Sequence, residues 1–261
     1  MRFPGFVLLA ALCLPIFAQA QPRVAGKIEL AEGIARIEAS GKPARRPAAG
    51  ERVHEGETIA TAAGAELHLA MADGASIIVR ERTRLKITAY VADGGTGDRS
   101  LLDLTEGALR AITGWIGRHN RNSYAVRTPL VTIGVRGTDH EPTHFLEGDP
   151  RGKPGTYDKV NEGVAVMRSP QGEVAIPKGR AAFLSLDGLP PQLLDAVPAF
   201  FKPGAYEREF AARAQQAERA LEELRQGRID ELLRLKDGKL NLPKVPTRDD
   251  LKRGLGDLLR R

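Results

Sequence analysis

The sequence has very little cysteine: its one cysteine, Cys13, lies within the first 20 residues. These residues combine Arg2, an apolar run and Ala18-Gln19-Ala20, which is the pattern of a secretory signal peptide with an A-x-A cleavage site. If cleavage removes residues 1–20, the mature chain has no thiol. Disulfides, thiolate nucleophiles and cysteine-based metal sites are then excluded.

Long apolar runs are also lacking. After residue 20 no stretch reaches the ~20 apolar residues that a membrane span requires. We therefore expect an exported protein with no transmembrane segment in the mature chain. The formal net charge is +6, and most of the basic excess follows Lys202. This basic tail lacks the interleaved aromatic residues of nucleic-acid-binding proteins, so no nucleic-acid partner is expected.

Short apolar alternations separated by turn signals run from Gly26 to about Leu186, which is typical of an all-β domain. Hairpins are expected at Glu32-Gly33, Asp73-Gly74 and Ser169–Gly172. In residues 66–71 the odd-numbered apolar positions are expected to be buried and the even-numbered ones wet.

A Glu-Gly pair occurs three times, at residues 32–33, 106–107 and 162–163. The unequal spacing argues against a strict repeat. Each pair is interpreted as a glycine with positive φ that links two strands, preceded by a solvated glutamate.

The pattern changes after the β region. Pro190, Pro191 and Pro198 predict a linker, and from Tyr206 to about Leu235 apolar residues recur at steps of three and four, which predicts an amphipathic helix. The expected organisation is a signal peptide at 1–20, a β domain at 21–188, a Pro-rich linker at 189–204 and a helical extension at 205–261. The extension is expected either to cover the β domain or to form a partner- or membrane-binding arm.

The stretch from His140 to His144 spells H-E-x-x-H, the zinc-hydrolase signature. In it, two histidines one helical turn apart bind the metal and the glutamate activates water. Pro142 opposes the helix that this geometry requires. The alternation of Val131, Ile133 and Val135 predicts a β-strand instead.

The strand is expected to run into a tight Gly-Thr turn at Gly137-Thr138. On this interpretation Gly137→Val would unfold the domain, because a β-branched residue would replace a required glycine.

No catalytic or cofactor-binding residues are assigned, since neither a Ser-His-Asp order nor a phosphate-binding glycine loop is present. The metal candidates are His140, Glu141 and His144. They form either a hydrolase centre, a surface metal-binding turn without catalysis, or simply a polar loop.

A second group of candidates could contact a glycan, although a buried tryptophan in a β core is the more common arrangement. This group consists of Trp115, Tyr124, Arg118, His119 and Arg121.

An ordered set of motifs between residues 26 and 186 resembles the FecR domain family. The set comprises Gly50–Glu57, a strand that ends at Asp73-Gly74, Leu104–Gly107, the run from Thr128 to Thr138, Val160–Val166 and Pro177–Gly179. The most distinctive run is Thr-Pro, a strand and Gly-Thr. Its structural residues here are Thr128, Pro129, Gly134, Gly137, Thr138 and Asp139.

The resemblance implies an all-β domain of short strands and hairpins, for which a β-helix-like arrangement is one alternative. In this chain the predicted α-helical extension follows the domain. The best-known members relay signals from an outer-membrane receptor to a cytoplasmic regulator. They carry a cytoplasmic N-terminal domain and a transmembrane helix where this sequence has the predicted signal peptide.

The expected function is therefore a non-enzymatic periplasmic binding or scaffolding module in envelope signalling or sensing. Its partner would be an envelope protein or a cell-wall ligand. The alternative is a zinc-dependent hydrolase that uses His140, Glu141 and His144.

Overall fold

The computed structural model describes residues 22–119, 122–204 and 206–208. The chain divides into two units, residues 1–204 and 205–261. The predicted signal peptide lies outside the described residues. The predicted helical extension also lies outside them, apart from residues 206–208, which are helical. Within the described ranges, no helix is long and apolar enough to cross a membrane.

The residues of the first unit that the structure describes form sixteen strands, which confirms the predicted all-β domain. The elements are, in chain order, β1 (Val24–Glu32), β2 (Ala35–Ala39), β3 (Lys42–Arg45), β4 (Arg52–His54), β5 (Thr58–Thr61), β6 (Glu66–Met71), β7 (Ser76–Val79), β8 (Arg84–Val91), β9 (Arg99–Ile112), α1 (Trp115–His119), β10 (Tyr124–Arg127), β11 (Thr132–His140), β12 (Thr143–Phe145), β13 (Gly155–Ser169), β14 (Gly172–Pro177), β15 (Ala181–Ser185) and β16 (Gln192–Leu193).

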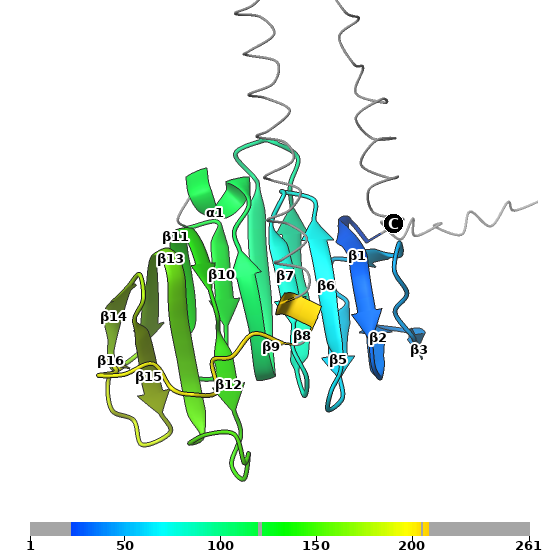
Figure 1. Cartoon of the computed structure of the whole chain (residues 1–261). Coiled ribbons are helices and arrows are strands. Elements are labelled where there is room, and N and C mark those ends of the chain that lie inside the picture. The colour runs from blue at the N-terminus through cyan, green and yellow to red at the C-terminus, as the bar shows by residue number, and fades with distance from the viewer. Residues whose placement is uncertain (1–21, 120–121, 205, 209–261) are drawn as a thin grey trace, which may run out of the picture. The chain divides into compact units, whose positions relative to one another are not determined.

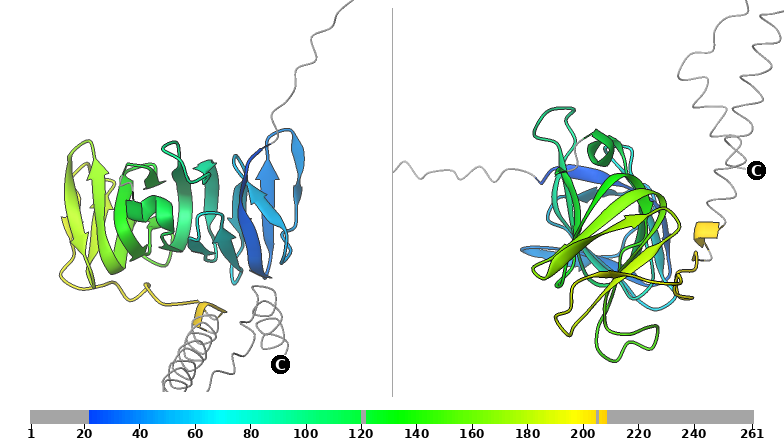
Figure 2. Two further views of the ribbon diagram at one scale, coloured as in Figure 1. Left: turned by 90° about the horizontal axis from the view of Figure 1, so that it is seen from above. Right: turned by 90° about the vertical axis from the view of Figure 1, so that its left-hand side faces the viewer.

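The strands lie side by side, from β1–β3 (blue in Figure 1) at one end to β14–β16 (yellow-green) at the other. Seen from the β14–β16 end, they surround a common interior (Figure 2). Aliphatic side chains fill it, among them Ile28, Leu69, Leu104, Ile133 and Met167. Among the described strands only β9 and β10 pair in parallel, and the other pairings are antiparallel. This pairing differs from the stacked parallel strands of a regular β-helix.

Two long strands bend at Glu-Gly pairs. β9 pairs with β8 before Gly107 and with β7 after it. β13 likewise pairs with β15 before Gly163 and with β14 after it. The φ angles of Gly107 and Gly163 are 89° and 78°. The predicted positive φ is confirmed, but these glycines bend one continuous strand and do not link two separate strands.

The predicted hairpin at Glu32-Gly33 is wrong. β1 pairs with β4 and β6, whereas β2 pairs with β3 and β5, so Gly33 leads the chain to new neighbours. The other two hairpins are confirmed, since β6 pairs with β7 and β13 pairs with β14. Of the three glutamates in the Glu-Gly pairs, only Glu162 is exposed, and Glu32 and Glu106 are half-buried.

The expected wet face of β6 is also wrong. Glu66 and His68 are 5% and 1% exposed. His68 Nε2 lies 2.5 Å from Glu66 Oε1, so the two buried polar groups are matched to each other. Because β6 pairs with β1 on one side and with β7 on the other, it lies within the sheet, away from its edges.

Residues 189–204, predicted as a Pro-rich linker, pack on the β domain. β16 pairs with β15, and Phe200 and Phe201 join an aromatic cluster with Phe145 and Tyr157. The centroid of the Phe200 ring lies 5.0 Å from that of Phe145 and 5.0 Å from that of Tyr157. Aromatic edge-to-face pairs of this kind stabilise by about 0.5–1.5 kcal/mol each beyond area burial.

Candidate functional site

The HExxH stretch lies in extended backbone. His140 is the last residue of β11 and His144 lies in β12, with Glu141 and Pro142 between the two strands. The Pro142 carbonyl accepts a 3.0 Å hydrogen bond from the Leu109 amide of β9. The strand interpretation of this region is thus confirmed. The two imidazoles do not have the one-turn helical spacing of the zinc-hydrolase signature.

The same residues are buried. His140 is 0% exposed, and Glu141 and His144 are each 3% exposed. A surface metal-binding turn requires accessible side chains, so that interpretation is wrong. The polar-loop interpretation is wrong for His140 and His144, because both lie in strands. Among the described residues no group of three or more His, Cys, Asp or Glu is arranged to hold a metal ion.

His140 is the centre of a buried chain of hydrogen bonds. Its Nδ1 lies 3.2 Å from Asp158 Oδ1, and its Nε2 lies 2.9 Å from the Tyr124 hydroxyl. With Nδ1 donating to the carboxylate, Nε2 of a neutral ring accepts from the tyrosine. Burial raises the pKa of Asp158, although His140 opposes the rise. Burial, reinforced by the charges of Asp158 and Asp73, also holds the pKa of Tyr124 well above its usual value.

Glu141 is held by a different set of groups. Arg80 Nη2 lies 2.7 Å from Oε2, and Lys159 Nζ lies 2.8 Å from Oε1. The Asn161 amide also donates to Oε1 at 2.8 Å. Burial opposes ionisation, but Arg80, Lys159 and Asn161 together keep the pKa of Glu141 below its usual value. The carboxylate is therefore charged, with an ion pair at each oxygen, and it is not directed at His140 or His144 as a water-activating base.

His144 has a third environment. Its Nδ1 lies 2.9 Å from Thr156 Oγ1, which in turn lies 2.8 Å from Thr128 Oγ1. Burial lowers the pKa of His144, and a backbone hydrogen bond with Gly155 only partly offsets this effect. The structure thus gives each of the three metal candidates its own hydrogen-bonding partners.

The residues of the Thr-Pro run have structural positions. Thr128 Oγ1 accepts from the amides of Leu130 and Val131, at 3.2 Å and 3.1 Å, and so forms the turn that starts β11. Pro129 lies in this turn, where no ladder amide is required.

Gly137 and Thr138 do not form a turn after the strand, because β11 continues to His140. The register with β13 shifts between Arg136 and Asp139, and Gly137 has a φ of 57° within this irregularity. The Thr138 amide donates to Thr113 Oγ1 at 2.8 Å. The predicted tight turn is therefore a β-bulge inside one strand. Asp139, the last residue of the motif, accepts from Arg110 at 2.6 Å.

The residues of the proposed glycan-contact group do not lie on one common surface. Tyr124 is buried and bound to His140, so it does not face a ligand. Trp115 is 37% exposed on α1, an unpredicted short helix, and its Nε1 donates to Asp98 at 2.9 Å. Arg118 and His119 are exposed on the same helix, and Arg121 lies outside the described residues.

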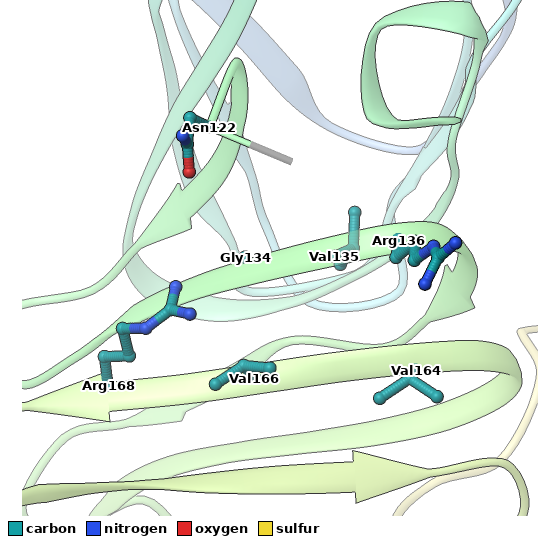
Figure 3. Close-up of a pocket in the computed structure, with 7 residues that line it drawn as sticks. All are labelled: Asn122, Gly134, Val135, Arg136, Val164, Val166 and Arg168. Atoms are coloured by element: carbon teal, nitrogen blue, oxygen red, sulfur yellow. The ribbon is translucent and has the colours of Figure 1, made fainter. Parts of the chain in front are cut away.

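A surface pocket of about 350 Å³ lies on the face shared by β11 and β13 (Figure 3). Its lining residues are Asn122, Gly134, Val135, Arg136, Val164, Val166 and Arg168. Gly134 is paired with Val166 across the ladder and Arg136 with Val164, so these four residues lie on one face. No sequence motif indicated this pocket. The alternation in residues 131–136 did place Gly134 and Arg136 opposite the buried valines, but it could not identify the partner strand.

Residues 57–150 match the family model described as FecR protein. This segment belongs to the FecR family. No curated protein matches the chain. Two crystal structures of a "putative anti-sigma factor" from Parabacteroides distasonis ATCC 8503 are similar at 15% sequence identity with a TM-score of 0.43, and the similarity covers 54% of this chain. It spans 60% of the length of that protein, which is less than two thirds of it.

The FecR segment contains β5 to β12, and with them the Thr-Pro run and the HExxH stretch. β13 lies beyond the matched residues, yet it supplies Asp158 to the buried chain and Val164, Val166 and Arg168 to the surface pocket. Both the buried hydrogen-bond chain and the surface pocket are therefore built from residues of the FecR segment together with residues of β13.

Proposed function

We propose that the chain is a non-enzymatic periplasmic module of an envelope signalling or sensing system, which binds an envelope protein or a cell-wall ligand. The FecR segment supports a role in signalling or sensing. The observation that carries the non-enzymatic part is the pairing of Glu141 with Arg80, Lys159 and Asn161. A carboxylate held in this way is neither open to water nor aimed at a metal.

The proposed binding role rests on the side chains that are exposed to solvent. The HExxH residues are buried, whereas Arg136, Val164 and Arg168 are exposed on the outer face of the sheet. The helical extension predicted at residues 205–261 is the second proposed binding element.

Export is tested by fractionating cells that produce the full chain and measuring the mass of the product. We expect a periplasmic protein that begins at Gln21. Retention in the cytoplasm with residues 1–20 attached would contradict the periplasmic part of the proposal.

Binding is tested by retaining envelope components on the immobilised mature protein, with and without residues 205–261. We expect a component that elutes reproducibly and is identified by mass spectrometry. If only the full-length protein retains it, the extension is the arm. If both proteins retain it, the β domain binds, and if neither does, the binding function is rejected.

A further inference from the structure

The floor of the β11–β13 pocket is open because Gly134 has no side chain. Gly134 lies in an ordinary strand conformation, so the backbone does not require glycine there. A Cβ at this position would lie 3.4 Å from Arg168 Nη1. The absent side chain therefore leaves space beneath the guanidinium. Val166 lies opposite Gly134, and the neighbouring Val164 is 43% exposed, which makes the floor apolar.

An arginine lies toward each end of this floor (Figure 3). Arg168 uses Nε to bind Glu173 at 2.8 Å, and its Nη1 faces Gly134. Arg136 is exposed, and within the part of the chain that the structure describes its side chain has no hydrogen bond or ion pair. None of the seven lining residues is acidic. Guanidinium groups bind carboxylates through two parallel hydrogen bonds, so the pocket favours a ligand with carboxylates.

The spacing of the two arginines specifies the ligand further. Arg168 pairs with Thr132, and Arg136 lies four residues farther along β11. At about 3.3 Å per residue, the two positions are about 13 Å apart along the strand. In an extended peptide, residues i, i+2 and i+4 face the same side and span the same length. Carboxylates at i and i+4 would meet the arginines, and an apolar residue at i+2 would pack on Val166, beside the Arg168 guanidinium that lies over Gly134.

We propose that this pocket binds an extended segment of a partner protein with two acidic residues four positions apart and an apolar residue midway between them. The proposal rests on the binding function above and names the chemistry of the partner. An anionic glycan could supply carboxylates, but it has no aliphatic side chain for the valine floor. The peptide is therefore the ligand that fits both the charge and the apolar surface.

The test uses the mature full-length protein and a capped, fluorescein-labelled peptide, Ser-Glu-Thr-Val-Thr-Glu-Ser. We expect saturable binding in fluorescence anisotropy, and at least tenfold weaker binding when both glutamates are replaced by glutamine or placed side by side. Arg136→Gln and Arg168→Gln should each weaken binding of the acidic peptide at least tenfold. Arg46→Gln is the matched control, because it removes an exposed arginine directly after β3, at the end of the row of strands opposite to β14, and should leave binding unchanged.

Gly134→Val separates a shaped pocket from general charge attraction. The substitution keeps both arginines but fills the floor, so we expect at least tenfold weaker binding with an unchanged melting temperature. Equal binding of the glutamine peptide, equal binding by the Gly134→Val protein, or no binding of the acidic peptide by the parent would each overturn the proposal.

If the parent retains an envelope component and the Arg136→Gln protein retains it equally, only the pocket proposal fails and the general binding function stands. Arginine-dependent binding of an anionic cell-wall fragment in place of the peptide would assign the pocket to a glycan and overturn the peptide proposal.

Discussion

Gly163 of β13 lies directly against the carbonyl oxygen of Gly137 in β11, and a Cβ on Gly163 would overlap that oxygen. Both glycines have positive φ, 78° and 57°. The bend of β13 and the bulge of β11 therefore meet at one point. Close backbone approach at this point lets β13 change partners while it remains paired with β11 on both sides of the irregularity.

Gly163→Ala should be strongly destabilising for two reasons. A non-glycine residue at positive φ costs about 1–3 kcal/mol, and forcing an extra atom against the backbone costs about 1–3 kcal/mol more. We expect a total loss of roughly 2–6 kcal/mol in the free energy of unfolding, measured by urea denaturation. Gly179→Ala is the matched control, because Gly179 has a φ of 77° with no atom within 4 Å of an added Cβ. Equal losses in the two variants would show that the contact with Gly137 does not matter.

Gly137→Val should destabilise by backbone strain alone. The nearest atom to an added Cβ is Arg118 Cγ, at 3.8 Å, which is an ordinary contact. We expect a loss of roughly 1–3 kcal/mol and a lower melting temperature, and no longer the complete unfolding that a tight turn would imply. Gly137→Asn should lose less, since asparagine tolerates left-handed backbone. A parent-like melting temperature for Gly137→Val would contradict the assigned bulge.

The sequence was sufficient for local features and insufficient for long-range pairing. Alternation of Val131, Ile133 and Val135 correctly predicted a strand, because one face of β11 is buried. The Glu-Gly pairs correctly predicted positive φ, since only glycine adopts it cheaply. Whether such a glycine turns the chain or bends a strand depends on which strands lie alongside, and these are set by contacts between residues far apart in the chain.

The burial of several polar groups was likewise not predictable from the sequence. Charged and polar side chains are usually solvated, so nothing in the sequence indicated that Glu66, His140 and Glu141 are buried. The partners of His140 and Glu141, such as Asp158 and Arg80, come from other parts of the chain. The pocket was missed for this reason as well: the face of β11 could be read from its alternation, but its pairing with β13 could not.

The His140–Asp158 pair should show strong coupling. His140→Leu alone leaves a fully buried carboxylate without its partner, and breaking such a pair typically costs about 3–5 kcal/mol. The double variant His140→Leu/Asp158→Leu removes both polar groups and should lose less than the sum of the single variants. Urea unfolding of the four proteins gives the coupling free energy. Additive losses would show that the pair does not interact.

Zinc content checks the hydrolase alternative directly. His140 and His144 are each bound to their own buried partners, so we expect the purified mature protein to contain far less than one zinc per chain by elemental analysis after dialysis against zinc. His144→Ala should give the same value as the parent. Stoichiometric zinc in the parent that is lost in His144→Ala would restore the metal interpretation of the HExxH stretch.

The burial of His144 predicts a pH-dependent stability. Its pKa is lowered in the folded protein, so as pH falls below about 6.5 the unfolded chain binds a proton there that the folded chain does not. The contribution of His144 is therefore fully present above the unfolded pKa and is lost as pH falls towards the folded pKa, by at most ~1.4 kcal/mol per pH unit. We expect His144→Gln to show a shallower decline in unfolding free energy than the parent between pH 7.5 and 5.5. His119→Gln, which removes an exposed histidine on α1, should keep the slope of the parent. If His144→Gln and the parent decline equally, another group causes the acid sensitivity, and His144 is not held neutral by its burial against β13.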